Sequence, residues 1–204
     1  MRTWAIFEPL VMFGLILAYI WKLRFTHPRF WVLLLAGMLL SHLVRRETPR
    51  RLGFGVINLR ALLHELAPLL LLIVLAILTA GLLFRTAGQI GFEAAIAAAV
   101  VYLPWGIVQQ YALNGYFLNR LQEAMPARPA SIAAALLFCL AHAPNPFLML
   151  VTFPLGWCAT ALYRRSRNLY LLGIAHAAIG LLLVLMVPPS VSHHLRVGPR
   201  WFQK

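Results

Sequence analysis

Long apolar stretches separated by short basic segments constrain this chain more than any other feature of its sequence. Of its 204 residues, 62% are hydrophobic, and the mean hydropathy is +0.80. Ordinary globular chains are only about 45 to 50% apolar. A chain with so little polar surface cannot cover itself toward water, so the stretches are predicted to be helices that cross a membrane, where helices satisfy their backbone hydrogen bonds internally.

The apolar stretches predict an all-α, polytopic membrane bundle with about seven spans, forming a single membrane domain over residues 1–204. A span needs about 20 apolar residues at a rise of about 1.5 Å each. The fifth stretch is short because Pro144 and Pro146 lack the amide hydrogen that a continuing helix needs. It is either a half-span or a re-entrant hairpin with the sixth. The predicted spans are 4–22, 28–44, 61–84, 90–118, 131–143, 147–163 and 169–187.

The net charge of +13 lies in short Lys and Arg clusters between the apolar stretches. This distribution is typical of loops that anchor spans, and it lacks the basic stripe of nucleic-acid-binding proteins. The expected partners are therefore membrane lipids, and nucleic acid is excluded. Loops on one side of the seven spans carry eleven of the 18 cations and the other side carries seven. This bias predicts a multi-pass protein of the inner or plasma membrane with a cytoplasmic N-terminus and an external C-terminus.

Four polar side chains on three spans fall at a similar predicted depth. Gln109, Gln110, His142 and His176 lie very roughly 12 to 18 Å from the predicted cytoplasmic ends at the helical rise. Polar groups in hydrocarbon are costly, so their convergence is what a polar cavity inside the bundle would require. The alternative is that they bond to one another across helices and only hold the bundle together.

Three short motifs in the second half carry a resemblance. They are Gln109-Gln110-Tyr111-Ala112-Leu113-Asn114-Gly115, then Phe138-Cys139-Leu140-Ala141-His142, then His176-Ala177-Ala178-Ile179-Gly180. Their order and spacing over about 100–185 resemble the core of the CPBP family, the CAAX proteases and bacteriocin-processing enzymes, also called the ABI family. The motifs of that family read Glu-Glu-x-x-x-Arg-Gly, Phe-x-x-x-His and His-x-x-x-Asn or Asp.

The resemblance implies an intramembrane endopeptidase that acts on a membrane-embedded or prenylated peptide. In the family, the first glutamate is thought to activate water, and the histidines are thought to position it and to stabilise the oxyanion. Carried over by position, Gln109, Gln110, His142 and His176 are the expected catalytic positions. Asn114 and Phe138 are then expected to contact the substrate.

The departures from the family pattern put hydrolysis in doubt. Both motif glutamates are glutamines, the motif arginine is Asn114, and the last polar position is Gly180. A glutamine amide can orient water but cannot take its proton as a carboxylate does. Two readings therefore stay open: an enzyme with a different base, such as one of the two histidines, and a catalytically silent relative that binds a membrane peptide or lipid or acts as a scaffold.

Other residues offer little help with chemistry. An older reading of the family made its motif residues metal ligands, but catalytic zinc uses three strong ligands and only two histidines converge here, so neither a metal nor another cofactor is expected. Glu47 and Glu123 are predicted in cytoplasmic loops, and Glu65 is predicted to pair with a loop arginine such as Arg60. Cys139 lies three residues before His142, which would suit a thiolate and a base, but membrane cysteines are usually apolar fillers.

Overall fold

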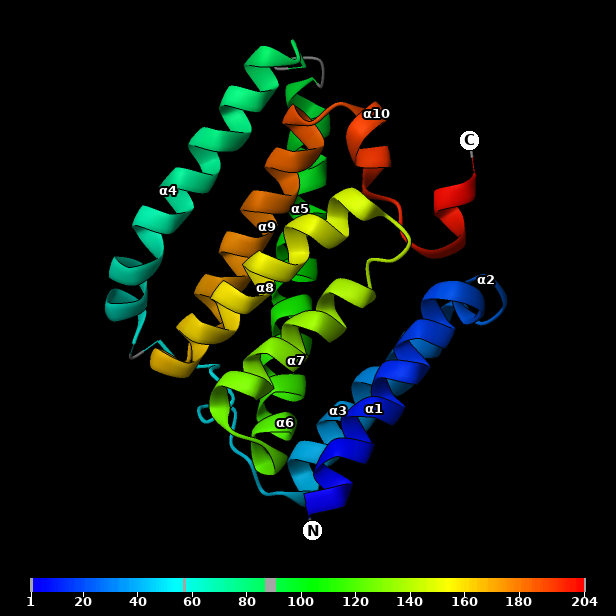
Figure 1. Cartoon of the computed structure of the whole chain (residues 1–204), viewed down its shortest axis with the longest axis vertical. Coiled ribbons are helices and arrows are strands. Elements are labelled where there is room, and N and C mark those ends of the chain that lie inside the picture. The colour runs from blue at the N-terminus through cyan, green and yellow to red at the C-terminus, as the bar shows by residue number, and fades with distance from the viewer. Residues whose placement is uncertain (1, 57, 87–90, 204) are drawn as a thin grey trace.

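The computed structural model describes residues 2–56, 58–86 and 91–203, and within these residues the fold is all-helical (Figure 1). Two π-helical segments, η1 and η3, continue α-helices without a break. The helices, in chain order, are α1 (Arg2–Ala18), η1 (Tyr19–Leu23), α2 (Arg24–Thr26), η2 (Pro28–Phe30), α3 (Trp31–Val44), α4 (Leu59–Leu83), α5 (Phe92–Gln110), η3 (Tyr111–Leu118), α6 (Asn119–Ala124), α7 (Ala127–Leu140), α8 (Pro146–Arg165), α9 (Leu169–Met186), α10 (Pro189–Ser192), η4 (His193–Leu195) and η5 (Gly198–Phe202).

The membrane character predicted from the sequence is confirmed. Among the described residues, five helical stretches are long and apolar enough to cross a membrane, and two shorter apolar helices, Pro28–Val44 and Ala127–Leu140, accompany them. Each of the seven predicted spans corresponds to one of these stretches. The largest difference in length is in the fourth, which runs unbroken from Phe92 to Ala124 because η3 and α6 extend it.

The helices alternate in direction, so that the segments after α3 and α8 meet at one end of the bundle (Figure 1). There Leu169 N donates to Gly53 O at 2.9 Å, and Asn168 Nδ2 donates to Gly55 O at 2.8 Å. The loop residues 45–56 and 166–168 therefore lie on the same side, as the alternating spans predict. We call this end the loop end of the bundle.

Helices α5 and α9 run antiparallel and cross at a pair of glycines. A Cβ atom on Gly106 would lie 2.6 Å from Gly173 O, and one on Gly173 would lie 2.6 Å from Ile107 Cγ1. Only glycine allows the two backbones to approach so closely, as small residues often do between membrane helices. This crossing fixes the distance between the two helices that carry the first and third motifs.

The segment after α9 folds back over the turn between α7 and α8. Asn145, which is fully buried, donates to Ser192 O at 3.0 Å and to Arg196 O at 3.1 Å, and its own Oδ1 accepts from Leu148 N at the start of α8. Gly198 N donates to the carbonyl oxygen of residue 143 in the same turn, at 2.8 Å. This C-terminal arrangement was not predicted, because the bonds join positions about 50 residues apart.

Candidate functional site

The first and third motifs meet in a short chain of hydrogen bonds between α5 and α9. Gln110 Nε2 lies 3.2 Å from His176 Nδ1, and Asn114 Nδ2 donates to Gln110 Oε1 at 2.7 Å. Gln110 and Asn114 are buried, and His176 is half-buried. With the amides in this orientation, Gln110 donates to His176, so the ring proton of a neutral His176 lies on Nε2.

The contact between Gln110 and His176 follows from the glycine crossing. Gln110 lies one turn after Gly106, and His176 lies about one turn after Gly173. Side chains of an α-helix lean toward the N-terminus of their own helix. In an antiparallel pair, side chains placed just beyond the crossing on both helices therefore lean back toward it and meet there.

The second motif joins this cluster through an aromatic ring. The Phe138 ring centroid lies 4.8 Å from that of His142 and 5.8 Å from that of His176, with both pairs close to edge-to-face. Gly156 on α8 leaves room for Phe138, because a Cβ there would lie 3.3 Å from Phe138 Cδ1. All three motifs thus contribute to one cluster, which we call the motif cluster: Gln110, Asn114, Phe138, His142 and His176.

The tautomer of His142 is set by a backbone carbonyl. Its Nδ1 lies 2.7 Å from Phe138 O, which can only accept, so Nδ1 carries the proton and Nε2 of the neutral ring is left as the basic nitrogen. Cys139 does not pair with His142. Its Sγ donates instead to Met149 O at 3.3 Å, so the geometry does not support a thiolate and base pair.

The two glutamines of the first motif differ in their surroundings. Gln110 is buried and makes both amide bonds described above, whereas Gln109, about 100° further round the helix, is half-buried. The structure therefore brings Gln110 to the histidines, and Gln109 borders the motif cluster from a different face of α5.

The last position of the third motif is filled from a neighbouring helix. A Cβ atom on Gly180 would lie only 3.0 Å from Cε1 of the Tyr102 ring on α5. In the family this position is Asn or Asp. The ring of Tyr102 therefore lies against the place where the polar side chain of the family would begin.

The first motif also lies where the helix widens. Asn114 belongs to η3, an eight-residue π-helical segment between α5 and α6. π-Helical turns are rare and often occur at functional sites, because they rotate the following residues relative to an α-helix. This segment could not be predicted from the sequence, since helical periodicity does not distinguish the two geometries over one or two turns.

No group of three His, Cys, Asp or Glu side chains that could hold a metal ion occurs among the described residues. Two open hollows of the described structure lie away from the motif cluster. One, of about 440 Å³, runs between α1 and α3, and the other, of about 330 Å³, lies over the C-terminal segment. The polar cavity predicted around the motif cluster stays a prediction.

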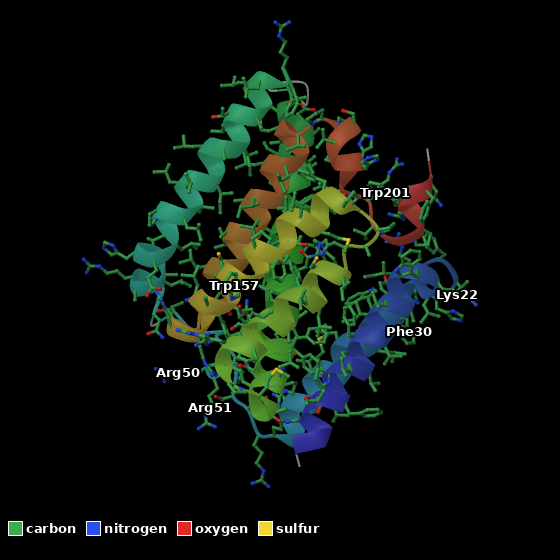
Figure 2. All side chains as sticks on the ribbon, viewed as in Figure 1. Lys22, Phe30, Arg50, Arg51, Trp157 and Trp201 are labelled. Atoms are coloured by element: carbon green, nitrogen blue, oxygen red, sulfur yellow. The ribbon has the colours of Figure 1, made fainter. Side chains whose placement is uncertain are left out.

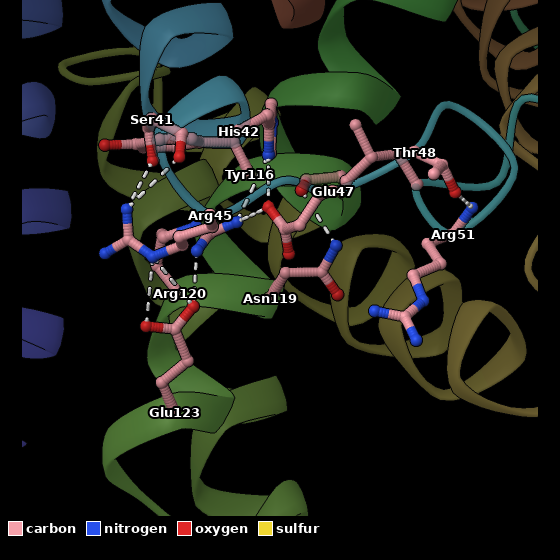
Figure 3. Close-up of polar contacts among 12 residues, drawn as sticks. Ser41, His42, Arg45, Glu47, Thr48, Arg51, Tyr116, Asn119, Arg120 and Glu123 are labelled. Carbon is pink, nitrogen blue, oxygen red and sulfur yellow. Dashed lines mark hydrogen bonds and ion pairs between the residues drawn. The ribbon is translucent and has the colours of Figure 1, made fainter.

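Sequence reasoning missed a buried ionic network at the loop end (Figure 3). Arg120 on α6 is fully buried and bonds to Glu47 and to Glu123. His42 Nδ1 lies 2.6 Å from Glu47 Oε2, and Arg45 reaches Glu123 at 3.2 Å. Arg45 also binds Glu8 on α1 at 2.5 Å, so that three helical segments are joined. We call these six residues the ionic network.

The structure corrects two predictions about single glutamates. Glu123 was predicted in a loop, but it lies on α6, because the helix of the first motif continues to Ala124. Glu65 was predicted to pair with an arginine such as Arg60, and its partner is Arg165 at 3.4 Å, from the loop end of α8. Arg165 lies 100 residues after Glu65 in the chain, so local sequence could not indicate this partner.

These observations define a polytopic helical membrane protein with a polar cluster held between its spans. Residues 91–182 match the family model for the Rce1-like type II CAAX prenyl endopeptidases. This match is consistent with the CPBP family, and the resemblance predicted from the motifs is confirmed. No curated protein and no solved structure matches the chain.

Proposed function

We propose that this protein binds a membrane-embedded or lipidated peptide at the motif cluster and does not carry out the glutamate-dependent hydrolysis of its family. The class of peptide follows from family membership over residues 91–182. The observation that carries the loss of hydrolysis is the neutral chain His176–Gln110–Asn114. It occupies the positions where the family motif would place a carboxylate and an arginine.

The hydrogen bonds of Gln110 support this proposal. Its Oε1 accepts from Asn114 and its Nε2 donates toward His176, so both ends of the amide are already engaged within the protein. An amide has essentially no basicity near neutral pH, so it cannot take a proton from water. The cluster retains donors and acceptors that can hold a peptide backbone, but it has lost the family's general base.

No other carboxylate of the chain replaces that base. All five glutamates lie among the described residues. Glu8, Glu47 and Glu123 belong to the ionic network, and Glu65 pairs with Arg165. Glu93 lies in the first turn of α5, about 25 Å along the helix from Gln110 at the helical rise.

A second candidate function, hydrolysis with a histidine as the base, is favoured by one observation. The bond from His142 Nδ1 to Phe138 O leaves Nε2 as the basic nitrogen, and His176 retains an Nε2–H donor in the arrangement described. One acceptor and one donor are the pair that water activation and oxyanion stabilisation require. This enzyme would differ from its relatives in its base.

The test compares peptidase activity of the purified protein in lipid with that of a Gln109→Glu/Gln110→Glu variant, against prenylated and membrane-embedded peptides. A restored general base typically contributes about 10² to 10⁴ in rate, so we expect cleavage in the variant and none in the wild type. Asn114→Arg is added in a third variant, because a carboxylate buried at 110 needs a cationic partner. Gln122→Glu on α6 is the matched control.

Each outcome separates the candidates. If the wild type cleaves a peptide and His142→Ala abolishes this cleavage, the protein is an enzyme with a histidine base and not a catalytically silent relative. Saturable peptide binding by the wild type, reduced by His176→Ala and without cleavage in any variant, would support binding alone. The absence of saturable binding by the wild type would overturn the proposed function.

We also propose that the loop end faces the cytoplasm, which places the N-terminus there. The support is the bias of eleven cations against seven between the two ends. Thr48→Cys, in an exposed position of the loop after α3, should be labelled only from the cytoplasmic side. Labelling from outside would reverse the orientation and leave the arrangement of the helices unchanged.

A further inference from the structure

The end of the bundle opposite the loop end carries a group of arginines that lack acidic partners. Residues 19–30 and 189–203 contain Lys22, Arg24, Arg29, Arg196 and Arg200 but no acidic residue. None of the five makes an ion pair with a carboxylate in the described part of the chain. At the loop end, by contrast, the half-buried Arg45 and the buried Arg120 both pair with glutamates.

Tertiary packing brings these two segments together. Arg24 Nη2 donates to Val197 O at 3.1 Å, and a Cβ on Gly198, whose φ is +60°, would lie 2.9 Å from Ile20 Cγ2. Figure 2 shows Lys22 and Trp201 on this side of the molecule and Arg50 and Arg51 at the loop end. Two basic segments more than 150 residues apart in sequence thus form one surface.

Two of the arginines share an aromatic ring. The Cζ atoms of Arg24 and Arg200 lie 4.8 Å and 6.0 Å from the centroid of Phe25. Arg24 Nε is buried and has no hydrogen-bond partner among the described residues. This Nε faces the protein interior, so an anion would have to accept from the terminal nitrogens of the two arginines. Two like charges around one ring attract such an anion.

The C-terminal half of this surface is held rigidly. His193, His194 and Leu195 have φ values of 48°, 55° and 53°, a left-handed conformation that is costly for residues other than glycine. The two hydrogen bonds from Asn145 flank this strained turn, because they end on Ser192 O and Arg196 O. The turn borders the hollow of about 330 Å³ that Arg196 and Trp201 also line.

The surroundings indicate which anion fits. Trp21 and Phe25 lie at the end of the first span and are 40% and 48% exposed, and Phe202, at the end of η5, is 69% exposed. Aromatic residues commonly anchor a protein at the membrane surface in such positions. A free anion would use the arginines alone, whereas a phospholipid would use the arginines for its phosphate and the aromatic side chains for its glycerol and upper acyl region. We propose that Arg24 and Arg200 form a binding site for the phosphate of an anionic phospholipid, independent of the motif cluster.

The experiment measures the thermal stability of the protein, purified in a neutral detergent, during titration with short-chain phosphatidylglycerol. A ligand that binds only the folded state raises the unfolding temperature. We expect this rise with phosphatidylglycerol, and a much smaller one with phosphatidylcholine of the same chains. Inorganic phosphate at the same concentration is the third arm, and an equal rise with it would assign the site to a free anion and overturn the lipid assignment.

The variants test the residues. Arg24→Gln/Arg200→Gln should weaken phosphatidylglycerol binding about thirtyfold, and Arg200→Gln alone about fivefold. Arg200 makes no side-chain hydrogen bond in the described structure, so its single variant keeps the fold intact. The control is Arg50→Gln/Arg51→Gln, which removes two exposed charges from the loop end and should leave binding unchanged. Equal rises with both lipids, or unchanged binding in Arg200→Gln and the double variant, would overturn the proposal.

Discussion

One continuous helix carries two polar regions of opposite character. From Phe92 to Ala124 it contributes Gln110 and Asn114 to the motif cluster and, two to three turns later, Arg120 and Glu123 to the ionic network. The polar side chains of the motif cluster are only amides and imidazoles, although the family motif has glutamates and an arginine there. The ionic network has three glutamates and two arginines around a histidine. The charges of this protein thus stabilise one end of the bundle, and its candidate site is left neutral.

The difference has an energetic reason. A buried charge is tolerated only when a partner of opposite charge and additional hydrogen bonds surround it. Arg120 has two glutamates within reach, whereas a carboxylate at 110 would face His176 and Asn114, neither of which carries a permanent charge. With glutamine at 110 and asparagine at 114, the site is joined by hydrogen bonds between neutral groups and needs no buried charge.

The largest effect should come from the ionic network. Arg120→Met removes a fully buried cation and leaves the half-buried Glu47 and the exposed Glu123 without their common partner. We expect a loss of about 3 kcal/mol in the free energy of unfolding, the lower end of the range for a broken buried ion pair, because neither glutamate is fully buried. Denaturant unfolding in detergent measures it, with Arg128→Met on the exposed start of α7 as the control. A loss no larger than that of the control would mean that the network does not hold this end together.

A smaller effect should follow from the helix crossing that assembles the motif cluster. Gly106→Ala places a methyl group against Gly173 O, and overpacking of this kind costs about 1 to 3 kcal/mol. The same variant should weaken peptide binding, because it moves Gln110 away from His176. Gly14→Ala is the matched control, since nothing lies within 4 Å of a Cβ there. If the two alanine variants are equally stable, the crossing is not tight.

The smallest effect should distinguish the two motif glutamines. Gln110→Ala removes two hydrogen bonds and leaves Asn114 buried without its acceptor, which costs about 1 to 2 kcal/mol. Gln109→Ala on the half-buried face should change stability by less than about 0.5 kcal/mol. Denaturant unfolding curves of the two variants give the difference between their free energies of unfolding. The reverse order would place Gln109, and not Gln110, at the centre of the cluster.

Much of the candidate site could be predicted from the sequence, but its contacts could not. The motif spacing placed Gln110, His142 and His176 on three neighbouring spans, and the structure brings them together through Phe138. The choice of Gln110 over Gln109 depends on the rotation of α5 against α9. The ring of Tyr102 fills the space next to Gly180 that a side chain at this position would need, and Tyr102 belongs to no motif.

The sequence by itself determined that this is a helical membrane protein, where its spans lie and which family its second half resembles. These properties follow from hydrophobicity and local spacing, which each segment carries on its own. Only the tertiary structure decided how Arg120, Glu47 and Glu8 are paired, and that residues 19–30 meet the C-terminal segment. Pairing between charges depends on which helix ends are neighbours in space, and neighbours separated by 70 or more residues leave no mark in local sequence.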